Sequence, residues 1–262
     1  MTSPAAPTPA TVRAVAEGAR AGTTLVALDF DGVLAPLVDD PAASRALPKS
    51  ARALEDLAAA GAPVALVSGR ALADLWAVAA PPAGVHLVGG HGAEQGLATA
   101  AGLVREPFDL PAGPARVLAE LTGALEALVG GTTARVERKP ASVVLHTRTA
   151  GPDAARLTAA ATALGRGAGV DVLAGKDVVE LAVLDVSKGE ALRALRARLG
   201  VGQVLYAGDD VTDERAFALL EPQDVTIKVG PGATAARHRL DGPAAVGALL
   251  TDLAALVTAA GS

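Results

Sequence analysis

Short apolar segments recur along the chain, and most of them end abruptly in polar residues or glycine. Uniformly apolar segments of this length, rather than alternating ones, are typical of strands buried on both faces, as in parallel sheets. They lie at residues 25–28, 63–67, 85–88 and 204–207. Helical patterns lie around them, at residues 11–21, 51–60, 71–79, 190–199, 214–220 and 244–260. This order predicts an α/β fold with a Rossmann-like parallel-sheet core, to which residues 225–229 add the last parallel strand.

The pattern changes after Gly90. Glycines at 92, 96 and 102 favour a short hairpin that ends near Arg105, and residues 108–114 favour a linker. Beyond the linker, helical and strand patterns alternate differently, with helices at 115–129 and 153–164 and strands at 135–138, 142–148, 170–173 and 178–183. In the second of these strands, Ser142, Val144, His146 and Arg148 fall on one face, which predicts a sheet exposed on one side.

These changes divide the chain into parts. We predict a disordered tail at residues 1–14, a core domain at residues 15–108 and 182–262, and an inserted α+β domain at residues 109–181. The tail is inferred from the Pro-, Thr- and Ala-rich start of the chain, which lacks the basic and apolar regions of a signal peptide.

Composition excludes several classes of function. A formal net charge of -5 offers no basic patch for nucleic acid, and the absence of cysteine excludes disulfides and thiolate metal sites. No apolar run reaches the roughly 18 residues of a membrane span. We therefore expect a cytoplasmic protein with neither a nucleic-acid nor a membrane partner. The sequence does not give the oligomeric state, for which a monomer is our expectation.

The first buried strand ends in Asp29-Phe30-Asp31-Gly32. Two carboxylates this close repel each other, and burial of either one without a partner is costly. A divalent cation between them removes the conflict, and an oxygen-only site suits Mg²⁺. The alternative reading is an ordinary strand that ends in an Asp-Gly turn.

Other polar residues also follow the predicted parallel strands. Ser68 follows the second strand, Asp209, Asp210 and Asp213 follow the strand at 204–207, and Lys188 begins a helix. Because carboxyl ends of parallel strands share one edge of the sheet, we expect these groups to meet there. Acids, a cation, a hydroxyl and an ammonium together are suited to phosphate chemistry. Taken singly, Lys188 is better explained as a solvated lysine at a helix start. The three aspartates could form a helix N-cap cluster, although one cap needs only one acid.

Four segments resemble, in order, the motifs of the haloacid dehalogenase superfamily of phosphatases. They are Asp29-Phe-Asp-Gly-Val-Leu, Ser68-Gly-Arg, Ser187-Lys-Gly and Gly208-Asp-Asp-Val-Thr-Asp-Glu. The insertion after the second motif resembles that superfamily's C2-type cap. The loop at 34–41, the turn at 90–94 and the full form of the last motif resemble the trehalose-6-phosphate phosphatase family. Residues 136–148 and 175–180 are similar to that family's two sugar-reading segments.

The resemblance implies Mg²⁺-dependent hydrolysis of trehalose 6-phosphate through an aspartyl-phosphate, in trehalose biosynthesis. Asp29 would be the nucleophile. Asp31 would protonate the leaving oxygen and later activate water, which requires a carboxyl that holds its proton near neutral pH. Ser68 and Lys188 would hold the phosphoryl group. The implied metal site comprises Asp29, Asp31 through its carbonyl, Asp209 and Asp210, with Asp213 behind them. The implied substrate-binding residues are Gly32, Arg70 and His91 in the core and Glu137, Lys139, Arg148, Lys176 and Glu180 in the insertion.

This chain departs from the family pattern at two places. Val33 stands where the first motif commonly has Thr, and residues 181–188 lack the Pro and Asn usual before the motif lysine. Other functions stay open, namely a sucrose-phosphate or mannosyl-phosphoglycerate phosphatase, a phosphomutase, and a catalytically silent sugar-phosphate binder. His146 either lines the sugar site or packs in the sheet.

Overall fold

The computed structural model describes residues 4–107, 110–184 and 186–259. It divides into unit 1, residues 1–107 and 187–262, and unit 2, residues 108–186. The predicted division ran between residues 108 and 109 and between 181 and 182, so the second boundary lies five residues later than expected.

Unit 1 is built on a mixed sheet with a parallel centre. Among the described residues its strand order is β12-β11-β10-β1-β2-β3-β4-β5, with only β4 and β5 antiparallel to their neighbours. The strands are β1 (Thr24–Leu28), β2 (Val64–Val67), β3 (His86–Gly89), β4 (Glu94–Thr99), β5 (Gly102–Arg105), β10 (Gln203–Gly208), β11 (Val225–Val229) and β12 (His238–Leu240). The predicted hairpin at 91–105 is therefore the antiparallel edge of this sheet.

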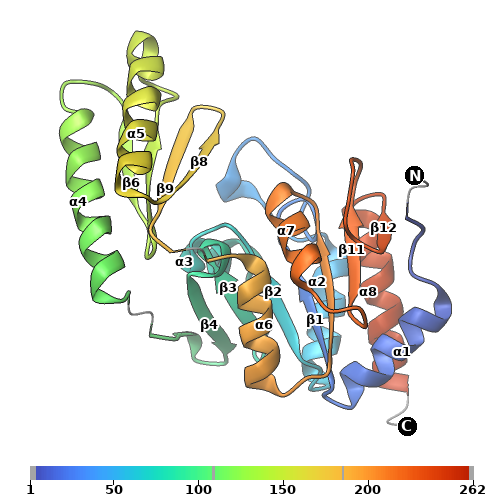
Figure 1. Ribbon diagram of the computed structural model, residues 1–262. Coiled ribbons are helices and arrows are strands. Elements are labelled where there is room, and N and C mark those ends of the chain that lie inside the picture. The colour runs from blue at the N-terminus through green and yellow to red at the C-terminus, as the bar shows by residue number, and fades with distance from the viewer. Residues whose placement is uncertain (1–3, 108–109, 185, 260–262) are drawn as a thin grey trace. The chain divides into compact units, whose positions relative to one another are not determined.

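Helices cover both faces of the sheet, as Figure 1 shows. One face carries α1 (Pro9–Arg20), α2 (Pro48–Ala59), α3 (Leu72–Ala79) and α8 (Pro243–Thr258), and the other carries α6 (Lys188–Leu199) and α7 (Val211–Leu219). Successive residues of β1 divide between the two layers. Val26 and Leu28 pack with the first set of helices, whereas Leu25 and Ala27 pack with the second. Burial on both faces explains why the central strands are apolar throughout.

Unit 2 has an antiparallel sheet with helices on one face only. Its strand order is β6-β7-β9-β8, formed by β6 (Arg135–Arg138), β7 (Ser142–His146), β8 (Asp171–Gly175) and β9 (Val178–Ala182). Helices α4 (Ala112–Leu128) and α5 (Ala154–Ala168) pack on the face that carries Val143, Leu145, Val179 and Leu181. Ser142, Val144 and His146 lie on the opposite face, so the predicted alternation along β7 is confirmed. The predicted exposure of that face is wrong for Ser142 and Val144, which are buried.

Several boundaries differ from the sequence-based prediction. Helix α1 begins at Pro9, capped by the Thr8 hydroxyl, so residues 9–14 are helical rather than part of a disordered tail. Proline is favoured in the first helical turn, where no amide partner is needed. Strand β12 was not predicted, because its sequence His-Arg-Leu has no apolar run. None of the helices formed by the described residues is both long enough and apolar enough to cross a membrane.

Candidate active site

Asp29 is the first residue after β1 and is 4% exposed. Its own amide donates to the Ala207 carbonyl of β10, which fixes its backbone at the carboxyl end of the sheet. Its Oδ1 accepts a hydrogen bond of 2.6 Å from the Phe30 amide, and its Oδ2 accepts one of 2.6 Å from Lys188 Nζ. Burial raises the pKa of Asp29, and Lys188 opposes that increase.

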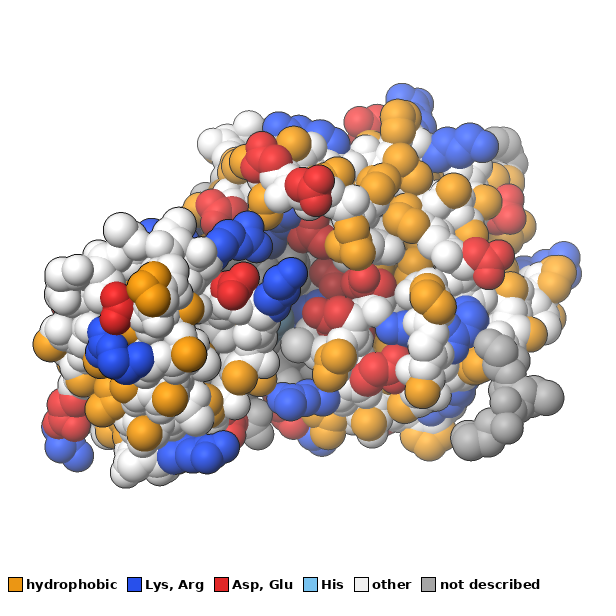
Figure 2. Space-filling model, turned by 90° about the horizontal axis from the view of Figure 1, so that it is seen from above, with side chains coloured by type: hydrophobic (Ala, Val, Ile, Leu, Met, Phe, Trp, Pro, Cys, Tyr) orange, Lys and Arg blue, Asp and Glu red, His pale blue; other side chains and the backbone are white. Residues whose placement is uncertain are grey.

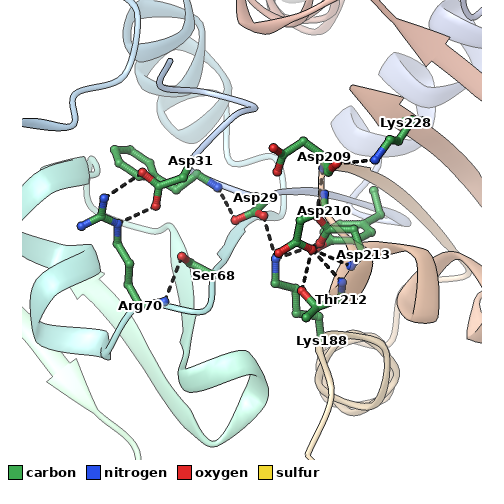
Figure 3. A network of polar contacts seen from close by, with 12 residues as sticks. Asp29, Asp31, Ser68, Arg70, Lys188, Asp209, Asp210, Thr212, Asp213 and Lys228 are labelled. Atoms are coloured by element: carbon green, nitrogen blue, oxygen red, sulfur yellow. Dashed lines mark hydrogen bonds and ion pairs between the residues drawn. The ribbon is translucent and has the colours of Figure 1, made fainter. Parts of the chain in front are cut away.

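Lys188 joins Asp29 to Asp213 (Figure 3). It is the first residue of α6, is 1% exposed, and donates to Asp213 Oδ1 at 2.8 Å. Burial alone would lower the pKa of Lys188, but Asp29 and Asp213 hold it above its ordinary value of 10.5. The alternative reading of Lys188 as a solvated lysine is therefore wrong.

Asp213 accepts hydrogen bonds on both of its carboxylate oxygens. Tyr206 donates its hydroxyl to Oδ1 at 2.5 Å, in addition to Lys188. The amides of Asp209 and Asp210 donate to Oδ2 at 2.8 and 3.0 Å. With four donors of the protein around it, Asp213 orients the Asp209–Asp210 loop and has little capacity left to bind a ligand itself.

Asp210 is the N-cap of α7. Its Oδ1 accepts from the amides of Thr212 and Asp213 at 2.8 and 3.0 Å, and from the Thr212 hydroxyl at 2.7 Å. Burial would raise the pKa of Asp210, but Lys188 and these hydrogen bonds lower it to about 2. Asp210 Oδ1 therefore caps α7, which explains why the helix begins at Val211 and not at Glu214. The role of Asp210 as a metal ligand stays a prediction, because these hydrogen bonds occupy only Oδ1.

The remaining carboxylates form the group best suited to a cation. Ligand oxygens of Asp29, Asp209 and Asp213 all lie within 4.8 Å of one another. Burial, with smaller contributions from Asp213 and Asp210, raises the pKa of Asp209 to about 6, so its ionised form is disfavoured here. Since Asp213 is saturated by donors, Asp29 and Asp209 are the side chains that fit a hard divalent cation such as Mg²⁺.

Gly32 allows Asp209 to approach this position. It has a φ of +75°, and a Cβ at Gly32 would lie 2.1 Å from Asp209 Oδ2. Only glycine meets both conditions without strain. The structure thus explains Gly32 by the room that it leaves for a carboxylate. Its role in substrate binding stays a prediction.

Asp31 does not face Asp29. In Figure 3 its carboxylate points to Arg70, which donates from Nε to Oδ2 at 2.6 Å and from Nη2 to Oδ1 at 2.7 Å. The Ser44 hydroxyl also donates to Oδ1, at 2.8 Å. Burial would raise the pKa of Asp31, but the hydrogen bonds from Arg70 and Ser44 hold it below its ordinary value. The expectation that Asp31 keeps a proton near neutral pH is therefore not met in this conformation.

Ser68 and His91 lie on adjoining turns. Ser68 follows β2 and is 2% exposed, and its Oγ accepts from the Arg70 amide at 3.2 Å. The His91 amide donates to the Ser68 carbonyl at 3.1 Å, and a Cβ on Gly69 would lie 2.4 Å from the His91 ring. His91 thus packs directly on the turn that carries Ser68 and Arg70.

Unit 2 gathers a second set of the predicted residues on the helix-free face of its sheet. Glu137 contacts His146 at 2.7 Å, and Glu180 accepts from Lys139 at 3.2 Å and from Ser142 at 2.5 Å. Arg148 and Lys176 lie just beyond the ends of β7 and β8, where both are exposed. The structure thus brings three of the predicted binding residues of this unit into hydrogen-bonded pairs, but not the other two.

Comparison with known proteins identifies the family. A profile of the trehalose-phosphatase family matches residues 27–243, which include every site residue described above. The chain belongs to the trehalose-phosphatase family.

Individual members support this placement. The trehalose-phosphate phosphatase of Mycobacterium avium is 37% identical over 245 residues, which are 87% of this chain and 61% of that protein. An uncharacterized glycosyl hydrolase of Mycobacterium tuberculosis is 38% identical over 247 residues, but these are only 18% of its length. The chain therefore spans about three fifths of one curated relative and less than a fifth of the other.

Solved structures of the family share the fold. The trehalose-6-phosphate phosphatase of Aspergillus fumigatus has a TM-score of 0.69 and 26% sequence identity, covering 96% of this chain and 99% of that one. A trehalose-6-phosphate phosphatase related protein has a TM-score of 0.67 and 27% identity, covering 88% of this chain and 97% of that chain.

In this member of the family, three residues around the site were missed by sequence reasoning: Ser44, Tyr206 and Lys228. Lys228 is 5% exposed, donates to the Asp209 carbonyl, and lies 3.6 Å from Glu214 Oε1. The sequence offered one signal for Lys228, since it is a charged residue within the otherwise uncharged strand β11. Ser44 and Tyr206 gave none, because no sequence pattern links their hydroxyls to Asp31 and Asp213, from which they lie 13 and 7 residues away. Figure 2 shows the acidic side chains gathered on the face of unit 1 that is seen from above.

Proposed function

We propose that this chain hydrolyses trehalose 6-phosphate to trehalose and phosphate. The observation that carries the proposal is the family match over residues 27–243, which spans both the carboxylate site of unit 1 and the polar face of unit 2. The pairing of Asp29 with the buried Lys188 supports it, because an ammonium beside a carboxylate also suits an incoming phosphoryl group.

We further propose Mg²⁺ as the cofactor, held by the carboxylates of Asp29 and Asp209 and by the backbone carbonyl of Asp31. When bound, the cation would supply positive charge to the phosphoryl oxygens and offset the repulsion among the carboxylates. The support is the oxygen-only donor set, in which carboxylate oxygens of Asp29, Asp209 and Asp213 lie within 4.8 Å of one another.

The proposed reaction has two steps. First, a carboxylate oxygen of Asp29 bonds to phosphorus, the bond from phosphorus to the sugar oxygen breaks, and Asp31 gives that oxygen a proton. Second, water attacks the phosphorus of the aspartyl-phosphate, Asp31 takes a proton from the water, and the bond to Asp29 breaks. Phosphate is released and both aspartates are restored. Ser68 and Lys188 hold the phosphoryl group through both steps.

This scheme places a demand on Asp31. As an acid it must carry a proton, whereas its pair with Arg70 and Ser44 favours the ionised form. We propose that the pair with Arg70 opens when substrate binds, since the phosphate is a competing partner for the guanidinium.

The polar face of unit 2 is proposed to bind the sugar. Glu137, Lys139, Arg148, Lys176 and Glu180 offer both acceptors and donors, which suits a disaccharide that is polar on all sides. The family resemblance of residues 136–148 and 175–180 supports this assignment.

A panel of phosphate esters tests the substrate. Phosphate release would be measured for trehalose 6-phosphate, sucrose 6-phosphate, glucose 6-phosphate and mannosyl-3-phosphoglycerate at the same Mg²⁺ concentration. The proposal predicts the highest kcat/KM for trehalose 6-phosphate. A higher value for another ester would reject this substrate, and isomer formation without free phosphate would indicate a mutase instead.

A further inference from the structure

The two predicted sugar-binding glutamates of unit 2 are arranged symmetrically about one residue. Strand β7 lies between β6 and β9, and Val144 of β7 is the register partner of both Glu137 on β6 and Glu180 on β9. The three side chains therefore form a row across the helix-free face of the sheet. Val144 is 2% exposed and separates the two carboxylates.

Strand β7 also supplies a donor for each carboxylate. Two residues before Val144, the Ser142 hydroxyl donates to Glu180 Oε1 at 2.5 Å. Two residues after it, His146 Nε2 lies 2.7 Å from Glu137 Oε2. Because an ionised carboxylate can only accept, Nε2 is the donor in this pair. Residues at positions i−2 and i+2 share the face of Val144, so one strand directs the two carboxylates toward its opposite ends.

The environment of each pair favours an orienting role. Ser142 is 5% exposed, and Glu180 is also held by Lys139 through both oxygens at 3.2 Å. Glu137 has a weaker alternative partner in Arg135, at 3.6 Å and with 66% of that side chain exposed. No described residue donates a hydrogen bond to Glu137 Oε1, so this oxygen has its full capacity to accept from a ligand hydroxyl.

We propose that Ser142 and His146 are positioning residues that hold Glu180 and Glu137 in the orientation needed to accept hydrogen bonds from sugar hydroxyls. This inference rests on the proposed function. A carboxylate fixed before binding loses less side-chain entropy when the sugar arrives, and its acceptor direction is already set. Neither residue touches the reacting phosphate, so their effect falls on sugar affinity.

Steady-state kinetics on two substrates tests the proposal. Ser142→Ala and His146→Leu each remove one donor and are expected to raise KM for trehalose 6-phosphate about tenfold, as for a lost hydrogen bond to a charged group. Neither should change the hydrolysis of p-nitrophenyl phosphate, which has no sugar. His146→Gln and Ser142→Thr keep a donor and should recover most of the affinity.

Asp171→Asn is the matched control. Asp171 lies on the same sheet face as Ser142, since both pair with Ala182, but Asp171 is on the outer strand β8 and exposed. Its replacement should leave KM unchanged. An unchanged KM in Ser142→Ala and His146→Leu would overturn the positioning role, as would an equal loss with both substrates. A wild-type chain that hydrolyses only the p-nitrophenyl ester would reject the proposed function itself.

Discussion

Lys188 holds two buried carboxylates in place, and this contact organises the site. Asp29 and Asp213 both receive its hydrogen bonds, and all three side chains are almost fully buried. A buried charge without a partner costs several kcal/mol, so the three groups are stable only together. Tyr206 adds a donor to Asp213, which then fixes the loop of Asp209 through two amides. Tyr206 and Asp213 thus fix the position of Asp209 without contacting the carboxylate of Asp209 itself.

Gly32 provides a residue-scale test with a control in the same chain. Gly32→Ala is expected to lower activity at least tenfold and to weaken Mg²⁺ binding, because the new Cβ would lie 2.1 Å from Asp209 Oδ2. Gly22→Ala is the matched variant, with a φ of +72° and no atom within 4 Å of the added Cβ. The left-handed backbone should cost each variant about 1–2 kcal/mol of stability, and the overlap with Asp209 should add to this cost in Gly32→Ala only. Equal kinetics in the two variants would contradict the account of Gly32.

His86 provides a pH test away from the carboxylates of the active site. Burial, with a contribution from Arg198, lowers its pKa below the ordinary value of 6.5. The unfolded chain therefore binds the proton more tightly, and the stability contributed by neutral His86 is complete above pH 6.5 and declines as the pH falls below it. The unfolding free energy of the wild type relative to His86→Gln should fall between pH 8 and pH 5, by at most about 1.4 kcal/mol per pH unit. Urea titrations across that range measure it, and a constant difference would refute the effect.

At the scale of elements, the end of each strand determines which polar residue reaches the site. Strand β1 delivers Asp29, β2 delivers Ser68, and β10 delivers Asp209, while α6 contributes Lys188 through its first residue. The β1–β10 and β1–β2 pairings are parallel, so these ends lie along one edge. The same pairing leaves Asp210 and Asp213 in the first turn of α7, where they form a capping box.

Helix α7 gives the element-scale prediction. Asp210→Ala should lose about 1 kcal/mol of stability through the missing cap, whereas Asp210→Asn keeps an acceptor oxygen and should lose much less. Calorimetric titration with Mg²⁺ should show a far greater loss of affinity in Asp209→Asn than in Asp210→Asn. If Asp210→Asn bound Mg²⁺ as poorly as Asp209→Asn, Asp210 would be a metal ligand as well as a helix cap.

The sequence predicted those elements whose hydrophobic pattern is visible within a short stretch of chain. Continuous apolar runs predicted the central strands, and the alternation at 142–148 predicted the one-sided sheet of unit 2. It did not find β12, because a short edge strand with exposed polar residues has no pattern of its own. It also could not tell whether Asp210 is a helix cap, a metal ligand or both, since sequence spacing does not distinguish these roles.

The contacts that alter the chemistry were beyond the reach of the sequence. The pair of Asp31 with Arg70 joins residues 39 positions apart, and that of Lys188 with Asp29 joins residues 159 apart. The motifs identified Asp31 as an acid, but only the structure places three hydrogen-bond donors on its carboxylate. Likewise, only the register of β7 with β6 and β9 shows that Ser142 and His146 lie beside Glu180 and Glu137.

At the scale of the molecule, two units with different sheets contribute different chemistry. The parallel sheet of unit 1 gathers carboxylates and a lysine, and the antiparallel sheet of unit 2 presents hydrogen-bonded polar residues on the face without helices. The family match covers both, and the chain spans about three fifths of a curated trehalose-phosphate phosphatase. We propose that unit 1 binds the phosphate and unit 2 binds the sugar.

The central claim is that Asp29 and a divalent cation together release phosphate from trehalose 6-phosphate. The most direct measurement is phosphate release from that ester by the wild type and by Asp29→Asn, each with Mg²⁺ and with EDTA. The account predicts turnover only in the wild type with Mg²⁺, with a fall of at least about a thousandfold in each of the other three conditions. Comparable turnover by Asp29→Asn, or by the wild type in EDTA, would contradict it.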